Sequence, residues 1–173
     1  FSLFIVILIL GNDVLGDGLN PGVVRYYALY RRSDPLKASE VLTHALILRL
    51  ALGIPVAAGG LVLMMPWTEQ LFHHSVYLKP ILLGVLGSLG AALWSFNLSV
   101  WQAREEFSWY GGMVTIVNVI RVASLPVLFV AGHLTLGMIM GLHVSVYYLC
   151  ALTGLWMLRR HLAEVRLNLP LLK

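Results

Sequence analysis

The sequence predicts an all-α, polytopic transmembrane helical bundle. Of its 173 residues, 59% are hydrophobic and only 12% are charged, and the mean hydropathy is +0.84. Soluble domains carry about one quarter charged residues, so this composition indicates an integral membrane protein. Polar segments also divide the chain into apolar stretches, most of them close to the ~20 residues that a membrane-spanning helix needs.

The first apolar stretch, 1–15, has neither a basic start nor a small-residue cleavage site, which disfavours a signal peptide. Its apolar run, residues 1–10, covers about 15 Å of helix, about half of a hydrocarbon core of ~30 Å. We therefore expect 1–173 to be one transmembrane region of a longer chain, truncated at both ends.

A polar stretch over residues 12–32 follows the first span and carries Gly16, Gly18, Pro21 and Gly22. Glycine is entropically costly to fix in a helix and proline lacks the amide donor, so a break near 16–21 is predicted. A short helix over 23–32 should come next. Its Arg25 has an amphipathic side chain suited to the membrane boundary.

Four further spans are predicted, and short polar segments separate them. Pro35 disfavours helix at the residue before it, and Ser39 is a candidate cap for the next helix. Residues 66–70 read as an interfacial exit, 73–80 as a loop, and 132–133 as a tight turn. The predicted spans are 41–65, 81–102, 111–131 and 134–158.

Small residues form two stripes at helical spacing, which indicates close helix packing. Partner interfaces in a larger complex are the alternative use of such stripes. One stripe lies in the span 81–102 and the other in the span 134–158; they consist of Gly84, Ser88, Ala91, Ser95 and Ser99, and of Gly137, Gly141 and Ser145.

The polar segments differ in charge on the two sides of the predicted bundle. Lys79 is the only basic residue assigned to one side. By the positive-inside rule the other side faces the cytoplasm, in a multi-pass protein of the cell inner (cytoplasmic) membrane. That side holds Arg31, Arg32, Lys37, Arg104, Arg159, Arg160 and Arg166.

Several function classes are not expected. The formal net charge of +4 is spread over segments that flank apolar spans, so binding of nucleic acid is not predicted. No Walker loop, serine elbow or HExxH sequence is present, and the adjacent His73 and His74 lack an acid or thiol at ligand spacing. Cys150 lies in an apolar run and reads as an inert core residue. We expect no enzyme activity, metal or cofactor.

Arg49 and Arg121 lie deep within predicted spans, where a charge costs about 2.5 to 3.5 kcal/mol unless water, a partner or a ligand meets it. Thr115 and Asn118 share a helical face with Arg121, and Asn97 is another buried amide that needs a partner. A cationic substrate pathway is one interpretation. Ion pairs of these arginines with Asp13, Asp17 or an acid in the part of the chain outside this sequence are the other.

Two segments carry a resemblance to a known family. Asp17, Gly18 and Leu19 end an apolar span and are followed by Arg25 and Ala28. This pattern resembles the second-helix signature of polysaccharide flippases in the multidrug/oligosaccharidyl-lipid/polysaccharide exporter superfamily. The end of the span 81–102 is similar to the family's fourth helix, with Gln102 and Ala103 before a charged turn and Phe107.

The resemblance covers the whole chain and implies helices two to six of one six-helix lobe. It implies a transporter that moves lipid-linked oligosaccharide, a polyprenyl-diphosphate sugar, across the membrane for polysaccharide biosynthesis. The implied partners are this substrate, membrane lipids, and a polysaccharide polymerase or biosynthetic complex. The fragment alone should not transport.

The residues expected along the substrate pathway are basic or amide side chains, because guanidinium groups match phosphate oxygens and amides can bond sugar hydroxyls. Asp13 and Asp17 are expected to form ion pairs or to couple transport to an ion. A peptidoglycan-precursor flippase, a multidrug or cation antiporter, and a non-transporting membrane scaffold remain alternatives. The expected pathway residues are Arg25, Arg49, Asn97, Asn118 and Arg121.

Overall fold

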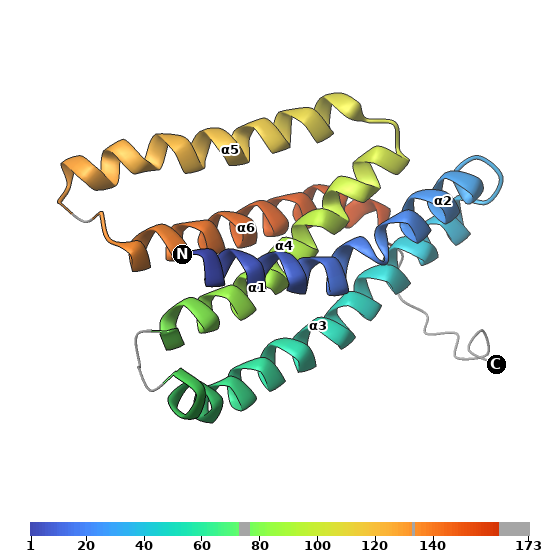
Figure 1. Cartoon of the computed structure of the whole chain (residues 1–173). Helices are drawn as coiled ribbons and strands as arrows, with labels where there is room; N and C mark the ends of the chain where they lie inside the picture. The colour runs from blue at the N-terminus through green and yellow to red at the C-terminus, as the bar shows by residue number, and fades with distance from the viewer. Residues whose placement is uncertain (73–76, 133, 163–173) are drawn as a thin grey trace.

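A computed structural model describes residues 1–72, 77–132 and 134–162, without the side chains of 63–72. Five of its helices are long and apolar enough to cross a membrane, which confirms the prediction of an all-α, multi-pass membrane protein. Figure 1 shows them as long rods. The elements are α1 (Ser2–Asn12), η1 (Asp13–Asp17), α2 (Asn20–Tyr30), α3 (Pro35–Phe72), α4 (Leu78–Ala103), α5 (Phe107–Val130), α6 (Leu136–Leu158) and η3 (Arg159–His161).

The first rod consists of α1, η1 and α2, and together these form a single candidate span, Ser2–Tyr30. The predicted break is present as a π-helical turn at η1, where the amide of Gly18 donates to the carbonyl of Asp13 at 3.3 Å. Pro21 stands in the first turn of α2, where its missing amide is not needed. The span therefore does not end at residue 15 as predicted, because the π-turn lets the helix continue.

The second rod, α3, begins at Pro35 and is capped by Asp34 instead of Ser39. The Asp34 carboxylate accepts a hydrogen bond from the Lys37 amide at 3.2 Å, and Ser39 instead donates to the carbonyl of His161 at 2.9 Å. The predicted exit at 66–70 is helical, because α3 continues to Phe72. Part of the predicted loop 73–80 is also helical, since α4 begins at Leu78; residues 73–76 lie outside the described set.

Helix α4 is the centre of the bundle and packs against α1, α2, α3, α5 and α6. Its predicted small-residue stripe is confirmed as a packing face toward α1. A Cβ atom added to Gly84 would lie 3.0 Å from the Ile7 side chain and 3.2 Å from the carbonyl of Phe4. One at Gly16 would lie 2.6 Å from the Ser95 hydroxyl. These close approaches occur within this chain and leave the stripe unavailable to a partner protein.

The stripe predicted on α6 does not pack closely against another helix of the described part of the chain. A Cβ at Gly141 would meet nothing within 4 Å, and one at Gly137 would meet only the flexible Lys79 side chain, at 2.7 Å from its nitrogen. The close contact on α6 lies at Gly154 instead, where an added Cβ would fall within 2.6 Å of Asn97 Cγ. A sequence stripe cannot show which of its members faces a neighbouring helix.

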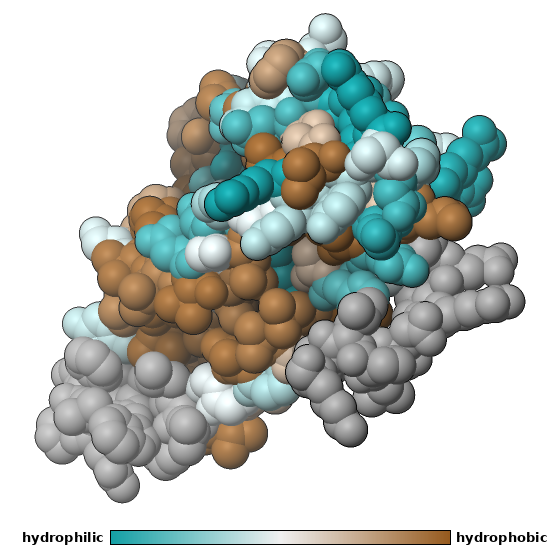
Figure 2. All heavy atoms as spheres, turned by 90° about the vertical axis from the view of Figure 1, so that its right-hand side faces the viewer, coloured by the Kyte–Doolittle hydropathy of each residue, from teal (hydrophilic) through white to brown (hydrophobic). Residues whose placement is uncertain are grey.

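Two hydrogen bonds bring three polar segments to one end of the bundle. Arg31 Nη1 donates to the carbonyl of Arg104 at 2.6 Å, and the Ser39–His161 bond joins the start of α3 to the end of α6. Figure 2 looks at this end, where hydrophilic residues gather above an apolar body. The described basic residues predicted to share one side are thus at one end, while Arg166 lies outside the described residues.

Helix α5 is the least buried of the five spans, and it packs against α6 and, less closely, α4. Most of its large side chains are exposed, including Val119, Val122 and Phe129. Helix α5 ends in a turn with Gly132 at φ +70°, close to the predicted turn at 132–133. His133, the other residue of that predicted turn, lies outside the described residues. The outward face of α5 is apolar, as expected for a surface that meets lipid or further helices.

Candidate functional site

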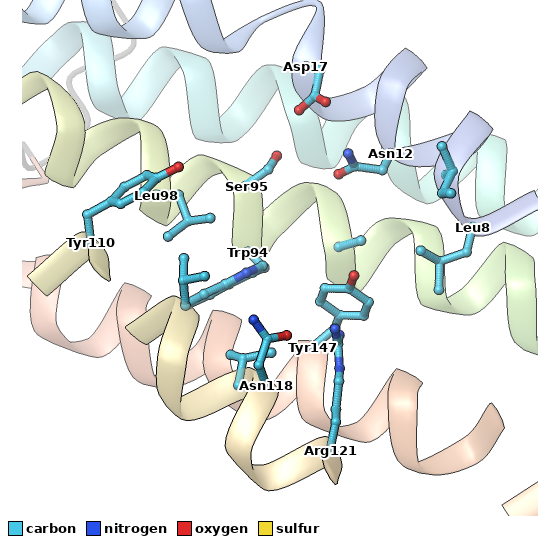
Figure 3. Close-up of a pocket in the computed structure, with 14 residues that line it drawn as sticks. Leu8, Asn12, Asp17, Trp94, Ser95, Leu98, Tyr110, Asn118, Arg121 and Tyr147 are labelled. Atoms are coloured by element: carbon cyan, nitrogen blue, oxygen red, sulfur yellow. The ribbon is translucent and has the colours of Figure 1, made fainter. Parts of the chain in front are cut away.

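A pocket of about 380 Å³ lies between the first rod and helices α4, α5 and α6. This volume is in the range of about 300–1,000 Å³ that is common for small-molecule sites. Figure 3 shows side chains from the four helical segments pointing toward it. The lining is apolar except for a few polar and aromatic groups: Asn12, Asp17, Trp94, Ser95, Tyr110, Asn118, Arg121 and Tyr147.

Arg121 forms part of the α5 wall of the pocket. Its guanidinium carbon lies 4.2 Å from the centre of the Tyr147 ring, in the geometry of a cation–π contact. Arg121 Nε and Nη2 are buried and have no hydrogen-bond partner among the described residues. A buried polar group without a partner costs about 1 to 3 kcal/mol. These two nitrogens are therefore available to donate hydrogen bonds to a ligand. Asn118, one turn earlier on α5, lines the same pocket.

Arg49 is buried behind the pocket, with only 1% of its surface exposed. Its Nη1 donates to the carbonyl of Ala92 on α4 at 2.8 Å, and its Nη2 donates to the carbonyl of Gly16 in the π-turn at 3.2 Å. The guanidinium also lies 5.1 Å from the centre of the Phe96 ring. Arg49 therefore ties α3 to α4 and to the irregular part of the first rod.

The structure places Arg49, which was expected on a substrate pathway, outside this pocket. The side chain does not line the pocket, and its terminal nitrogens are already hydrogen-bonded. A direct ion pair with Asp13 or Asp17 is not formed either. Within the described residues, the ion pairs below 4.0 Å are Lys37–Asp34 and Arg104–Glu106. The terminal nitrogens of Arg49 instead bond two backbone carbonyls and the Asn20 side chain, while its Nε is buried without a partner among the described residues.

Asn20 connects Arg49 to the carboxylate of Asp17. Asn20 Oδ1 accepts a hydrogen bond from Arg49 Nη2, and Asn20 Nδ2 donates to Asp17 Oδ1 at 3.0 Å. Asp17 is exposed and lines the pocket, as does Asn12, whose Oδ1 is buried without a partner among the described residues. Asp13 is exposed and does not line the pocket. The pocket therefore has a carboxylate and an unpaired amide oxygen on its α1–η1 wall.

Three other expected positions lie outside the pocket. Asn97 is fully buried between α4 and α6, where its Nδ2 donates to the carbonyl of Ala151 at 2.9 Å. Its burial makes it a packing residue.

Arg25 is exposed, and its guanidinium carbon lies 6.0 Å from the centre of the neighbouring Tyr26 ring. Thr115 is exposed and does not line the pocket, although it was expected to share the polar face of Arg121.

Sequence reasoning found Asp17, Asn118 and Arg121 but missed other polar groups of the site. Asn12 and Asn20 stand in the polar stretch 12–32, and that position is a signal that could have singled them out. Ser95 was assigned to the small-residue stripe alone, yet its hydroxyl also lies 3.5 Å from Arg49 Nη1. Nothing in the sequence indicates that Tyr147 on α6 would cover Arg121.

Comparisons with protein-family models, with curated proteins and with solved structures give no match for this chain.

Proposed function

We propose that this chain is part of a membrane transporter for a lipid-linked oligosaccharide, whose diphosphate enters the pocket beside Arg121. The observation that carries the proposal is that Nε and Nη2 of Arg121 are buried at a pocket between membrane-spanning helices and have no partner among the residues that the structure describes. A guanidinium presents a planar set of donors that matches phosphate oxygens. Isoprenoid tails of such a substrate could stay in the bilayer while the headgroup crosses.

The rest of the proposal follows from the resemblance and from the distribution of charge. The cell inner membrane is the proposed location, with the basic end of the bundle in the cytoplasm. The sugar would lie against the amide of Asn118 and the ring of Trp94, both of which line the pocket. A polysaccharide polymerase or another biosynthetic enzyme would then use the exported substrate. A peptidoglycan-precursor flippase would use the same diphosphate chemistry.

The experiment is transport in proteoliposomes that contain the full-length protein and a polyprenyl-diphosphate-linked oligosaccharide. Movement is measured as access of an added lectin to the sugar. Arg121→Gln should lower the initial rate about tenfold or more, because the loss of even ~1.4 kcal/mol of binding has this effect. The matched control is Arg159→Gln, at an exposed arginine of the basic end. Equal rates for the protein and for Arg121→Gln would refute the proposal.

A cation-coupled antiporter is the second candidate, and Asp17 is the observation that favours it. A carboxylate on a pocket within a membrane span is unusual and commonly functional. An antiporter requires that Asp17→Asn abolish transport while Arg121→Gln retains it. The flippase proposal expects Arg121→Gln to have the larger effect on movement of the lipid-linked sugar.

A further inference from the structure

The two walls of the pocket carry opposite charges. Figure 3 shows Asp17 on the side of the first rod and Arg121 on the opposite side, from α5. Neither residue has an ion-pair partner within 4.0 Å among the described residues. A charge inside a membrane span is costly unless water, a partner or a ligand meets it. The pocket thus has two separate charges to satisfy, one negative and one positive.

The hydrogen-bonding groups of the two walls follow the same division. Within the described part of the chain, Arg121 Nε and Nη2 on the α5 wall are donors without an acceptor. On the α1–η1 wall, Asn12 Oδ1 is an acceptor without a donor in the same part of the chain, and the Asp17 carboxylate accepts a hydrogen bond from Asn20. A ligand that complements both walls must accept hydrogen bonds at one end and donate them at the other.

Arg49 attracts the Asp17 carboxylate electrostatically but does not contact it. Arg49 is 1% exposed, and its terminal nitrogens are bonded to the carbonyls of Gly16 and Ala92 and to Asn20. Asn20 stands between the guanidinium and the carboxylate, so a ligand in the pocket would meet Asp17 and not Arg49. A carboxylate favours an ammonium over a neutral hydroxyl, because the hydrogen bond is then charge-assisted on both sides.

We propose that the pocket selects a zwitterionic headgroup, with its phosphate against Arg121 and its ammonium against Asp17 and Asn12. This inference rests on the proposed function for the phosphate end and adds a cationic amino group to the substrate class. The amino group could belong to an amino sugar of a lipid-linked oligosaccharide or to the headgroup of an aminophospholipid. In both cases the same phosphate and ammonium chemistry would be recognised.

The test is native mass spectrometry of the full-length protein with two short-chain lipids at equal concentration. The probes are phosphatidylethanolamine and its N-acetyl derivative, which keeps the phosphate but replaces the ammonium with a neutral amide. We expect the ethanolamine lipid to bind about tenfold more tightly, an ion-pair contribution of ~1.4 kcal/mol. Asp17→Asn should abolish this preference. The matched control is Asp13→Asn, at an exposed aspartate that does not line the pocket.

Two further arms separate this inference from the proposed function and identify the source of the headgroup. If both lipids bind equally in a manner that Arg121→Gln abolishes, the phosphate site stands and the zwitterionic inference is wrong. If neither lipid binds, the zwitterionic inference is wrong, and the transport assay with Arg121→Gln decides the proposed function separately. Competition by an amino-sugar diphosphate lipid, but not by its N-acetylated form, would support the inference for a lipid-linked sugar. Competition by both forms alike would contradict it.

Discussion

Arg49 and Asp17 are linked through the amide of Asn20 and do not form an ion pair. Arg49 Nη2 donates to Asn20 Oδ1, and Asn20 Nδ2 donates to Asp17 Oδ1 at 3.0 Å. The guanidinium also bonds the carbonyl of Gly16 within the π-helical turn. Turns of this kind disturb the regular hydrogen bonds of a helix and often occur at functional sites. Arg49 thus stabilises the irregular segment that places Asp17 at the pocket.

Replacement of Arg49 by alanine should destabilise the bundle strongly. The change removes the Arg49 hydrogen bonds to the carbonyls of Gly16 and Ala92 and leaves a cavity between α3, α4 and the first rod, which we expect to cost about 3 kcal/mol. Arg49→Lys should recover part of this loss, because a single ammonium cannot reach the first rod and α4 together. The measurement is thermal unfolding of the purified protein in detergent, followed by tryptophan fluorescence.

Arg25→Ala is the control for this prediction. Arg25 is exposed, and the contact described for it is with the neighbouring Tyr26 ring. Its loss should therefore leave the midpoint temperature of thermal unfolding almost unchanged. Equal midpoints for Arg49→Ala and Arg25→Ala would show that Arg49 does not clamp the bundle.

Alanine at Gly154 and at Gly141 should have opposite effects although both glycines belong to α6. A Cβ at Gly154 would enter the space of Asn97, with Cγ only 2.6 Å away, and overpacking of this kind costs about 1 to 3 kcal/mol. A Cβ at Gly141 meets nothing within 4 Å, so Gly141→Ala should stabilise the helix by up to about 1 kcal/mol. The same unfolding assay measures both. If Gly154→Ala is neutral, the close α4–α6 contact is wrong.

The Asp34 cap should make the stability depend on pH in the acidic range. Its hydrogen bond from the Lys37 amide lowers the pKa of Asp34 from its ordinary value, and the Lys37 charge lowers it further. The cap therefore stabilises the folded state above the ordinary carboxyl pKa of about 3.9, and this contribution is lost as the pH falls through the lower folded pKa. Asp34→Asn keeps an acceptor but removes the charge.

We expect the difference in unfolding midpoint between the protein and Asp34→Asn to be largest near neutral pH. It should shrink as the pH is lowered past the pKa of Asp34 in a maltoside detergent, whose headgroup does not titrate in this range. A difference that stays constant with pH would rule out a charged cap at the start of α3.

Hydropathy and charge were enough to predict the fold class, the existence of the five spans and the grouping of Arg31, Arg104 and Arg159 at one end. The boundaries were less accurate, since Asp34 replaced Ser39 as a cap and helix α3 continued through Pro66. Proline in the sequence weakens a helix, but tertiary packing can override the preference.

The candidate site was predictable only in part. Asp17, Asn118 and Arg121 are conspicuous because polar residues are costly within a membrane span. The different environments of Arg49 and Arg121 could not be predicted, because both are deep arginines without a nearby acid in sequence. Their difference arises from the π-turn and from the position of Tyr147, which depend on how distant segments meet.

Arg121 is proposed to bind an anionic headgroup, whereas exposed Arg25 outside the pocket is not. The most direct measurement is equilibrium binding of farnesyl diphosphate, a short-chain polyprenyl diphosphate, to the purified full-length protein by isothermal titration calorimetry. We predict saturable binding that Arg121→Gln weakens about tenfold or more and that Arg25→Gln leaves unchanged. Unaltered affinity in Arg121→Gln, with the variant folded by its unfolding midpoint, would contradict the account.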